Sequence, residues 1–146
     1  MNAKTILSRF TLSFSSHGER GGIHVARWGG ASSRTANMLA LTGPTGRVLL
    51  YVRVRTEGSG FWGLNYAQLK SLQSSNLPWF VALLLGPSET AYLLPAQLVN
   101  RAIESGSWSE GKWEYKVHDN HEINGALRFN SYADLFDELV AAYVVT

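Results

Sequence analysis

No cysteine occurs among the 146 residues of this chain, which excludes disulfide bonds, zinc–thiolate centres and a cysteine nucleophile. Charged residues are also few: Asp, Glu, Lys and Arg make up 16% of the sequence, whereas hydrophobic residues make up 45%. This balance indicates a folded globular protein and argues against disorder. A chain of this length is typical of one domain, so we expect residues 1–146 to form a single domain. The lack of cysteine is compatible with the reducing cytoplasm, where we expect the protein to reside.

Long hydrophobic runs are absent as well. The longest apolar stretch, residues 77–86, is much shorter than the roughly 20 residues that a membrane-spanning helix needs, and it contains Pro78. The N-terminus has no apolar segment followed by a small-residue cleavage site. We therefore expect neither a membrane span nor a secretory signal peptide.

Acidic residues are scarce in the first part of the chain. Residues 1–88 contain nine Lys and Arg residues against two Asp and Glu residues, whereas residues 89–146 contain four against nine. Such an asymmetry can steer an anion toward one side of a molecule. An equally good interpretation is that the two parts attract each other, within the fold or across a dimer interface.

Hydrophobic periodicity predicts a series of strands followed by alternating helices and strands. The expected strands are residues 4–14, 23–28, 36–42, 47–56, 79–85, 90–94, 113–118 and 126–129. A short helix over residues 2–9 is the alternative for the first of them. The expected helices are residues 66–74, residues 95–105 and a C-terminal helix that begins after Ser131. This order predicts an α/β or α+β fold, with a central mixed β-sheet flanked by helices.

Turn and capping residues support several of these elements. The turn signal at residues 43–46 predicts a hairpin between the strands on either side of it. Asn65 is a suitable N-cap for the helix at residues 66–74, and Ser131 and Asp134 have the spacing of a capping box. Residues 79–85 form a continuous apolar run that is too short for a core helix, which predicts a buried central strand.

The strand predicted at residues 47–56 carries two arginines on one face. Alternation places Arg53 and Arg55 together, and the apolar residues at positions 48, 50, 52 and 54 on the opposite face. No acidic residue within the strand balances the two guanidinium groups, and unpaired charge is too costly to bury. The pair must therefore face water, an anion or an acidic partner.

The block from Ile23 to Pro95 contains several predicted strands and one predicted helix. Its segments are residues 35–41, 51–56, 59–65, the helix around Gln68 and Leu69, and residues 79–84 and 91–95. In their order and their spacing along the chain, these segments resemble the PD-(D/E)XK restriction-endonuclease-like superfamily. In that family one strand supplies an aspartate, and the next supplies an acid or glutamine, one intervening residue and a lysine; together these residues hold magnesium and activate water. The resemblance implies a restriction-endonuclease-like fold.

The residues at the family's catalytic positions differ from the family pattern. By position, Asn37 stands where the aspartate belongs, and Arg53 and Arg55 stand where the acid or glutamine and the lysine belong. A divalent cation about 5 Å from one guanidinium would be repelled by roughly 6–7 kcal/mol at an effective dielectric constant of about 20. Arginine also keeps its proton, so neither residue can act as a general base. We therefore expect no catalytic residue, no metal and no cofactor at this site.

Two acidic residues could restore metal binding and an active nuclease. Glu57 continues the face of Arg53 and Arg55 if the strand extends that far, although a salt bridge to Arg55 is the simpler interpretation. Glu19 lies in a loop predicted at residues 15–22, where the family places a helix that carries an acid. We expect neither residue to have a catalytic role.

A pair of arginines suits phosphate or carboxylate, because guanidinium groups form bidentate hydrogen bonds with these anions. In this interpretation Asn37, Arg53 and Arg55 form the centre of an anion-binding face. The basic residues expected to extend it are Arg27, Arg34 and Arg47.

Trp62 follows Phe61 in the glycine-containing loop predicted at residues 57–63, and we expect it to be exposed. It could stack on a nucleic-acid base or anchor a protein interface.

Residues 118–122 have a His-x-x-His spacing that could supply two metal ligands, but no other His or Cys pair supports a zinc site. We interpret this segment as a polar surface turn.

The leading hypothesis is a non-catalytic, nuclease-like domain that binds a polyanion, nucleic acid in particular, through its arginine-lined face. The alternative is a homodimer or protein-partner-binding module in which the arginines pair with acidic residues of another chain. Candidates for those acids are Asp134, Asp137 and Glu138, on the face of the C-terminal helix that we expect to be exposed.

Overall fold

The computed structural model describes residues 2–29, 37–55 and 60–143. Its α-helices are α1 (Ala3–Gly21), α2 (Tyr66–Gln73), α3 (Ala96–Glu104) and α4 (Tyr132–Tyr143). Its strands are β1 (His24–Arg27), β2 (Met38–Thr42), β3 (Arg47–Val54), β4 (Phe61–Asn65), β5 (Trp79–Leu84), β6 (Ala91–Pro95), β7 (Ser109–Glu110), β8 (Glu114–His118) and β9 (Leu127–Phe129). A 3-10 helix, η2, spans His121–Ile123.

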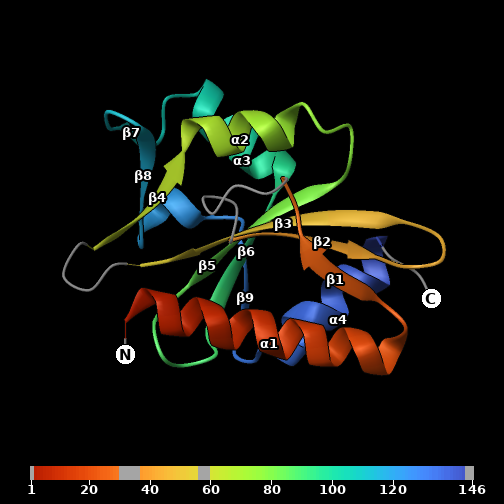
Figure 1. Ribbon diagram of the computed structural model, residues 1–146. Coiled ribbons are helices and arrows are strands. Elements are labelled where there is room, and N and C mark those ends of the chain that lie inside the picture. Colours follow the sequence, from red (N-terminus) through yellow and green to blue (C-terminus); the bar gives the residue numbers. More distant parts are fainter. Residues whose placement is uncertain (1, 30–36, 56–59, 144–146) are drawn as a thin grey trace.

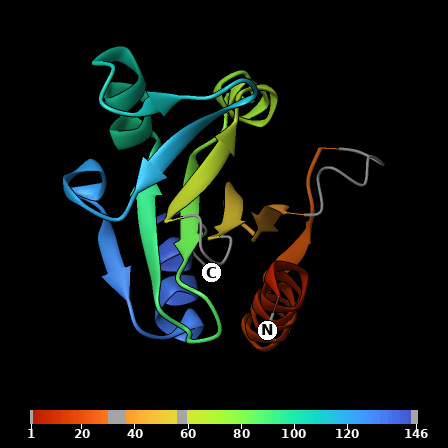
Figure 2. The same ribbon diagram turned by 90° about the vertical axis from the view of Figure 1, so that its left-hand side faces the viewer.

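These strands form two sheets. The central sheet has six strands in the order β1-β2-β3-β5-β6-β9, in which β3 and β5 are parallel and the other neighbours are antiparallel. A small antiparallel sheet has the order β4-β8-β7. Figure 1 shows α1 and α4 on one side of the central sheet, with α2, α3 and the small sheet on the other, and Figure 2 shows the same layers after a turn of 90°. The predicted class, a mixed sheet flanked by helices, is confirmed.

Each side of the central sheet has its own hydrophobic core. We call the side covered by α1 and α4 the helical face; its core includes Phe10 and Phe14 of α1 and Leu50 of β3. We call the opposite side the mixed face; its core includes Tyr51 of β3 and Trp62 of β4. Side-chain alternation along β3 therefore divides its residues between two different coverings.

The strand predicted at residues 4–14 is wrong, because these residues belong to α1. The buried residues Ile6, Phe10 and Phe14 recur every fourth position, and this spacing fits one face of a helix as well as one face of a strand. Asn2 resolves the ambiguity: its side chain accepts a hydrogen bond from the Thr5 backbone N–H at 2.9 Å and caps the first turn. The alternative helix over residues 2–9 has the right type but is too short.

The loop predicted at residues 57–63 is partly wrong, since β4 begins at Phe61. The partner of β4 is β8, so the pairing joins Trp62 to Val117, far along the chain. Such a long-range pair leaves no local signal in sequence. The predicted strand at residues 113–118 is confirmed as β8.

Several local predictions are confirmed. The turn at residues 43–46 joins β2 to β3 in a hairpin, and the Asn65 side chain caps α2 by accepting from the Ala67 N–H at 2.9 Å. Ser131 accepts from the Asp134 N–H at 3.1 Å at the start of α4. The strand β5 lies inside the central sheet and is buried along its whole length. In the described part of the chain, no helix is both long and apolar enough to cross a membrane.

Candidate anion-binding site

The site lies where β3 leaves the core of the mixed face. Leu49 and Tyr51 are fully buried there, and the next two residues with the same orientation are Arg53 and Arg55. Both arginines are partly exposed. The predicted placement of Arg53 and Arg55 on one face of the strand is therefore confirmed.

Arg55 is held on two sides. Its Nη1 lies 3.3 Å from Oδ2 of Asp119, and the two side chains are 31% and 33% exposed. Its guanidinium carbon lies 4.9 Å from the centre of the Trp62 ring, which is the geometry of a cation–π contact. Trp62 is itself fixed, because its Nε1–H donates to the Leu84 carbonyl at 2.9 Å. The guanidinium of Arg55 is therefore oriented before any ligand arrives.

The register of the central sheet places a third arginine in line with Arg53. Arg53 pairs with Leu83, Leu83 with Tyr92, and Tyr92 with Arg128, so these four residues form one row across β3, β5, β6 and β9. Paired residues share a face of the sheet, and three strand spacings amount to about 14 Å. The Arg128 guanidinium carbon lies 5.9 Å from the Tyr92 ring centre. We call Arg53, Arg55 and Arg128 the arginine strip.

Asp119 lies between the two ends of this strip. While one of its carboxylate oxygens faces Arg55, the other, Oδ1, accepts a hydrogen bond from the Tyr92 hydroxyl at 3.4 Å. Asp119 follows β8 directly and precedes η2. Residues 118–122 were interpreted as a polar surface turn; in the structure this segment also brings a carboxylate to the arginines.

Arg53 lacks the partners that Arg55 has. Its guanidinium carbon is 5.9 Å from the Tyr51 ring centre, and its Nε is buried with no hydrogen-bond partner among the described residues. A buried donor without an acceptor costs about 1–3 kcal/mol. The Arg53 side chain is therefore placed at some cost to stability.

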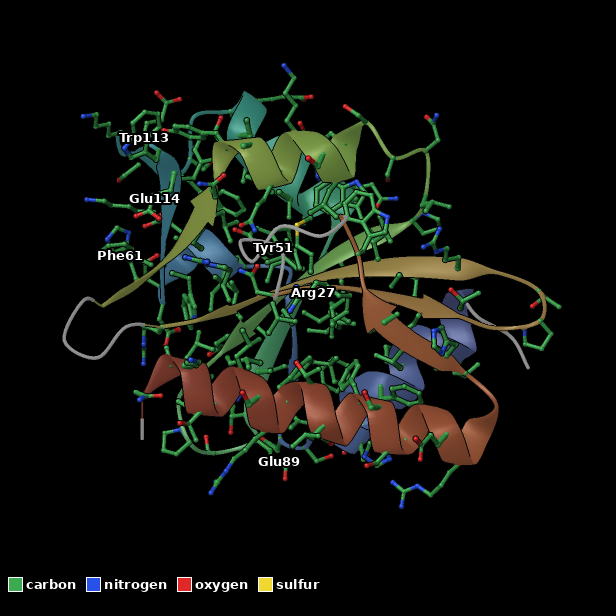
Figure 3. All side chains as sticks on the ribbon, viewed as in Figure 1. Arg27, Tyr51, Phe61, Glu89, Trp113 and Glu114 are labelled. Carbon is green, nitrogen blue, oxygen red and sulfur yellow. The ribbon has the colours of Figure 1, made fainter. Side chains whose placement is uncertain are left out.

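Tyr51 connects β3 to the small sheet. Its hydroxyl oxygen accepts a hydrogen bond from the Asn65 N–H at 3.1 Å, at the end of β4. Burial raises the pKa of Tyr51 above 10.0, although nearby Arg53 and the Asn65 hydrogen bond oppose this shift. The hydroxyl is therefore neutral near pH 7 and holds β4, with Trp62, against β3. Figure 3 labels Tyr51 together with Phe61 and Glu114 of the small sheet.

The backbone of Asn37 lies beside the same end of β3. Its carbonyl oxygen accepts from the Val52 N–H at 2.8 Å, and its side-chain Oδ1 accepts from Nε2 of Gln68 at 3.1 Å. The Asn37 side chain therefore already has a partner in α2.

The other predicted basic residues lie elsewhere. Arg47 is exposed at the opposite end of β3, about 20 Å from Arg53 for six residues of extended strand. Arg27 pairs with Leu39, which pairs with Leu50, so it has the orientation of the helical face. Neither residue extends the arginine strip. Arg34 lies outside the described residues.

Trp62 was expected to be exposed, and this prediction is wrong: its side chain is 0% exposed and packs in the core of the mixed face. In this position it supports Arg55 and offers no free ring face to a base.

Glu19 belongs to the last turn of α1 and not to a loop. That end of α1 leads into β1, whose first residue, His24, pairs with Thr42 and through it with Arg47, so Glu19 lies at the far end of the sheet. Glu57 lies outside the described residues.

The strip does not offer the ligands that magnesium needs. Asp119 is the carboxylate that contacts it, and that carboxylate faces Arg55. Nowhere among the residues that the structure describes do three His, Cys, Asp or Glu side chains gather as a possible metal site. Two neighbouring guanidinium groups do not fit a divalent cation, which prefers carboxylate oxygens.

Comparisons with known proteins identify the fold. No family model matches this chain, and no curated protein does. Among solved structures, the chain is similar to Hjc, a Holliday junction resolvase of the archaeal hyperthermophile Archaeoglobus fulgidus, determined at 1.6 Å resolution. The match has a TM-score of 0.54 and 15% sequence identity, and it covers 88% of this chain and 98% of that chain. The restriction-endonuclease-like fold that the sequence predicted is thereby confirmed.

Proposed function

We propose that residues 1–146 form a single nuclease-like domain that binds nucleic acid through the arginine strip and does not cleave it. The observation that carries this proposal is the alignment of Arg53 and Arg128 in one cross-strand row, with Arg55 adjacent and oriented by Trp62. Three guanidinium groups on one side of a sheet suit an extended anion with several phosphates better than a single small anion. The likeness to a junction resolvase supports nucleic acid as that anion.

The absence of cleavage follows from the chemistry of the strip. A guanidinium group cannot act as a general base, so Arg53 and Arg55 cannot remove a proton from water. A metal at their position would be repelled by both charges. The same two charges favour a phosphate in the ground state. The strip can therefore bind the phosphates of a nucleic acid but cannot catalyse their hydrolysis.

The direct test is binding to labelled single- and double-stranded DNA and RNA, and to a four-way DNA junction. The junction is included because Hjc is a junction resolvase. We expect binding at about 50 mM salt that weakens steeply by about 200 mM, because phosphate contacts release counterions. Incubation of plasmid and junction with magnesium or manganese is expected to give no cleavage products. Absence of binding at the lower salt concentration would exclude the proposed function.

The second candidate is a homodimer in which acidic residues of one copy meet the strip of another. Asp134, Asp137 and Glu138 are exposed on α4 and form no ion pair within the described chain, which is the observation in its favour. Light scattering at two ionic strengths separates the candidates. A charge-paired dimer is expected to dissociate as salt rises, whereas a monomer at every concentration would remove this candidate.

A further inference from the structure

Asp119 occupies the position that a bound anion would take on Arg55. Its Oδ2 lies 3.3 Å from Arg55 Nη1, and its Oδ1 lies 3.4 Å from the Tyr92 hydroxyl. Tyr92 in turn contacts Arg128 through its ring. One carboxylate therefore lies between the two halves of the arginine strip, with an oxygen directed toward each half.

This contact is weak enough to be displaced. The two side chains are about one-third exposed, and ion pairs at such positions contribute little net free energy. Removal of the carboxylate would not disorder Arg55, because the Trp62 ring still supports its guanidinium from the other side. An incoming phosphate could therefore replace Asp119 without rearranging the strand.

Arg53 provides a contrast in the same strip. No described carboxylate lies within ion-pair distance of it, and no described residue forms a hydrogen bond with its buried Nε. Among the described residues, the strip thus combines one arginine that has an internal counterion with another that has none. A ligand with a single anionic group must compete with Asp119 to reach Arg55, whereas a polyanion can first engage Arg53 and Arg128.

We propose that Asp119 is an internal competitor for the anion site on Arg55, which selects polyanions over single anions. The proposal rests on the proposed function for the identity of the polyanion, but competition at Arg55 can be measured without nucleic acid. When phosphate binds, the Asp119 carboxylate moves off Arg55 and keeps only its hydrogen bond to Tyr92. Asp119 is therefore a specificity residue, and the arginines are the binding residues.

The experiment is a titration with inorganic phosphate, followed through the NMR signal of the Arg55 Nε–H group. Wild type is compared with D119N, which keeps the size of the side chain and an oxygen for Tyr92, and with D119A. We expect both variants to bind phosphate about two- to sixfold more tightly than wild type, which is the fold-change equivalent of an exposed ion pair. E104Q is the control for loss of charge, because it removes one exposed negative charge from the last residue of α3, and it is expected to leave phosphate affinity unchanged.

A second comparison shows whether the gain acts through Arg55. In an R55M background, followed through the corresponding signal of Arg53, D119N is expected to give no gain in affinity. Equal phosphate affinity of wild type and both Asp119 variants would overturn the proposal, and so would an equal gain in E104Q. Absence of any phosphate shift at Arg55 in D119N would also overturn it.

The two proposals fail in different ways. If phosphate binds Arg55 more tightly in D119N but no oligonucleotide binds either protein, then the internal competitor is supported and the proposed function is excluded. If oligonucleotides bind wild type and D119N equally, and phosphate does too, then the proposed function stands and the role of Asp119 is excluded. Near-ultraviolet circular dichroism of each variant confirms that the fold is retained.

Discussion

The two faces of the central sheet differ in how completely they are covered. On the helical face, α1 and α4 meet through aromatic contacts: the Phe14 ring centre lies 5.2 Å from that of Phe136, and the Phe10 ring centre lies 4.8 Å from that of Tyr132. On the mixed face, short helices and the small sheet cover Tyr51 but leave Arg53 and Arg55 partly exposed. The packing of α1 and α4 stabilises the fold. The elements that cover the mixed face end beside Arg53 and Arg55 of the β3 segment. We infer that the candidate anion-binding site lies at the edge of the mixed face, because that face is less completely covered.

The largest effect is expected from a truncation on the helical face. F14A removes a fully buried ring between α1 and α4, and we expect the free energy of unfolding to fall by about 3–5 kcal/mol. Urea denaturation followed by tryptophan fluorescence measures this loss. Nucleic-acid affinity of the folded protein should be unchanged at low temperature. A large loss of affinity in the folded protein would show that the two faces are not independent.

Two glycines, Gly18 in α1 and Gly63 in β4, test how rigidly each face of the central sheet is packed. A Cβ at Gly18 would collide with the backbone carbonyl of Ile23, so we expect G18A to destabilise by about 1–3 kcal/mol. A Cβ at Gly63 would meet the end of the Glu114 side chain, which is flexible and can move away. We therefore expect G63A to cost less than about 1 kcal/mol, although Gly63 is buried in β4. Thermal unfolding of the two variants compares them, and an equal loss would contradict the difference in rigidity.

The smallest effect on stability is expected at the strip itself. R53M removes a buried donor that has no partner in the described part of the chain, so the free energy of unfolding should stay constant or rise by up to about 1 kcal/mol. Its nucleic-acid affinity should fall, and the slope of log affinity against log salt should decrease in magnitude by about one. R47M is the matched control at the exposed end of the same strand, and it should change neither quantity. A loss of stability in R53M without a loss of affinity would assign Arg53 to the fold alone.

Sequence predicted the parts of the site that depend on local alternation. The orientation of Arg53 and Arg55 follows from period-two alternation within one strand. The predicted hairpin of β2 and β3 is also a local feature, since its two strands are joined by a short turn. The spacing of Ile6, Phe10 and Phe14 fits two periods, and its assignment to a strand failed because the capping role of Asn2 went unrecognised.

Sequence did not predict the parts that depend on pairing between distant segments. Trp62 is buried because β4 pairs with β8, and the same pairing brings Asp119 to Arg55, 64 residues away in the chain. Arg128 joins the strip only through the register of three strand pairs. A basic residue in the predicted short strand at residues 126–129 was the available signal, but no local pattern gives its row in the sheet.

The salt dependence of DNA binding tests the role of the arginine strip most directly. Three phosphate contacts predict a slope of about −2.7 for log affinity against log salt on duplex DNA. We expect this slope for wild type and a slope near zero for the triple variant R53M/R55M/R128M. The same steep slope in both proteins would contradict it, because the contacts that release counterions would then lie outside the strip.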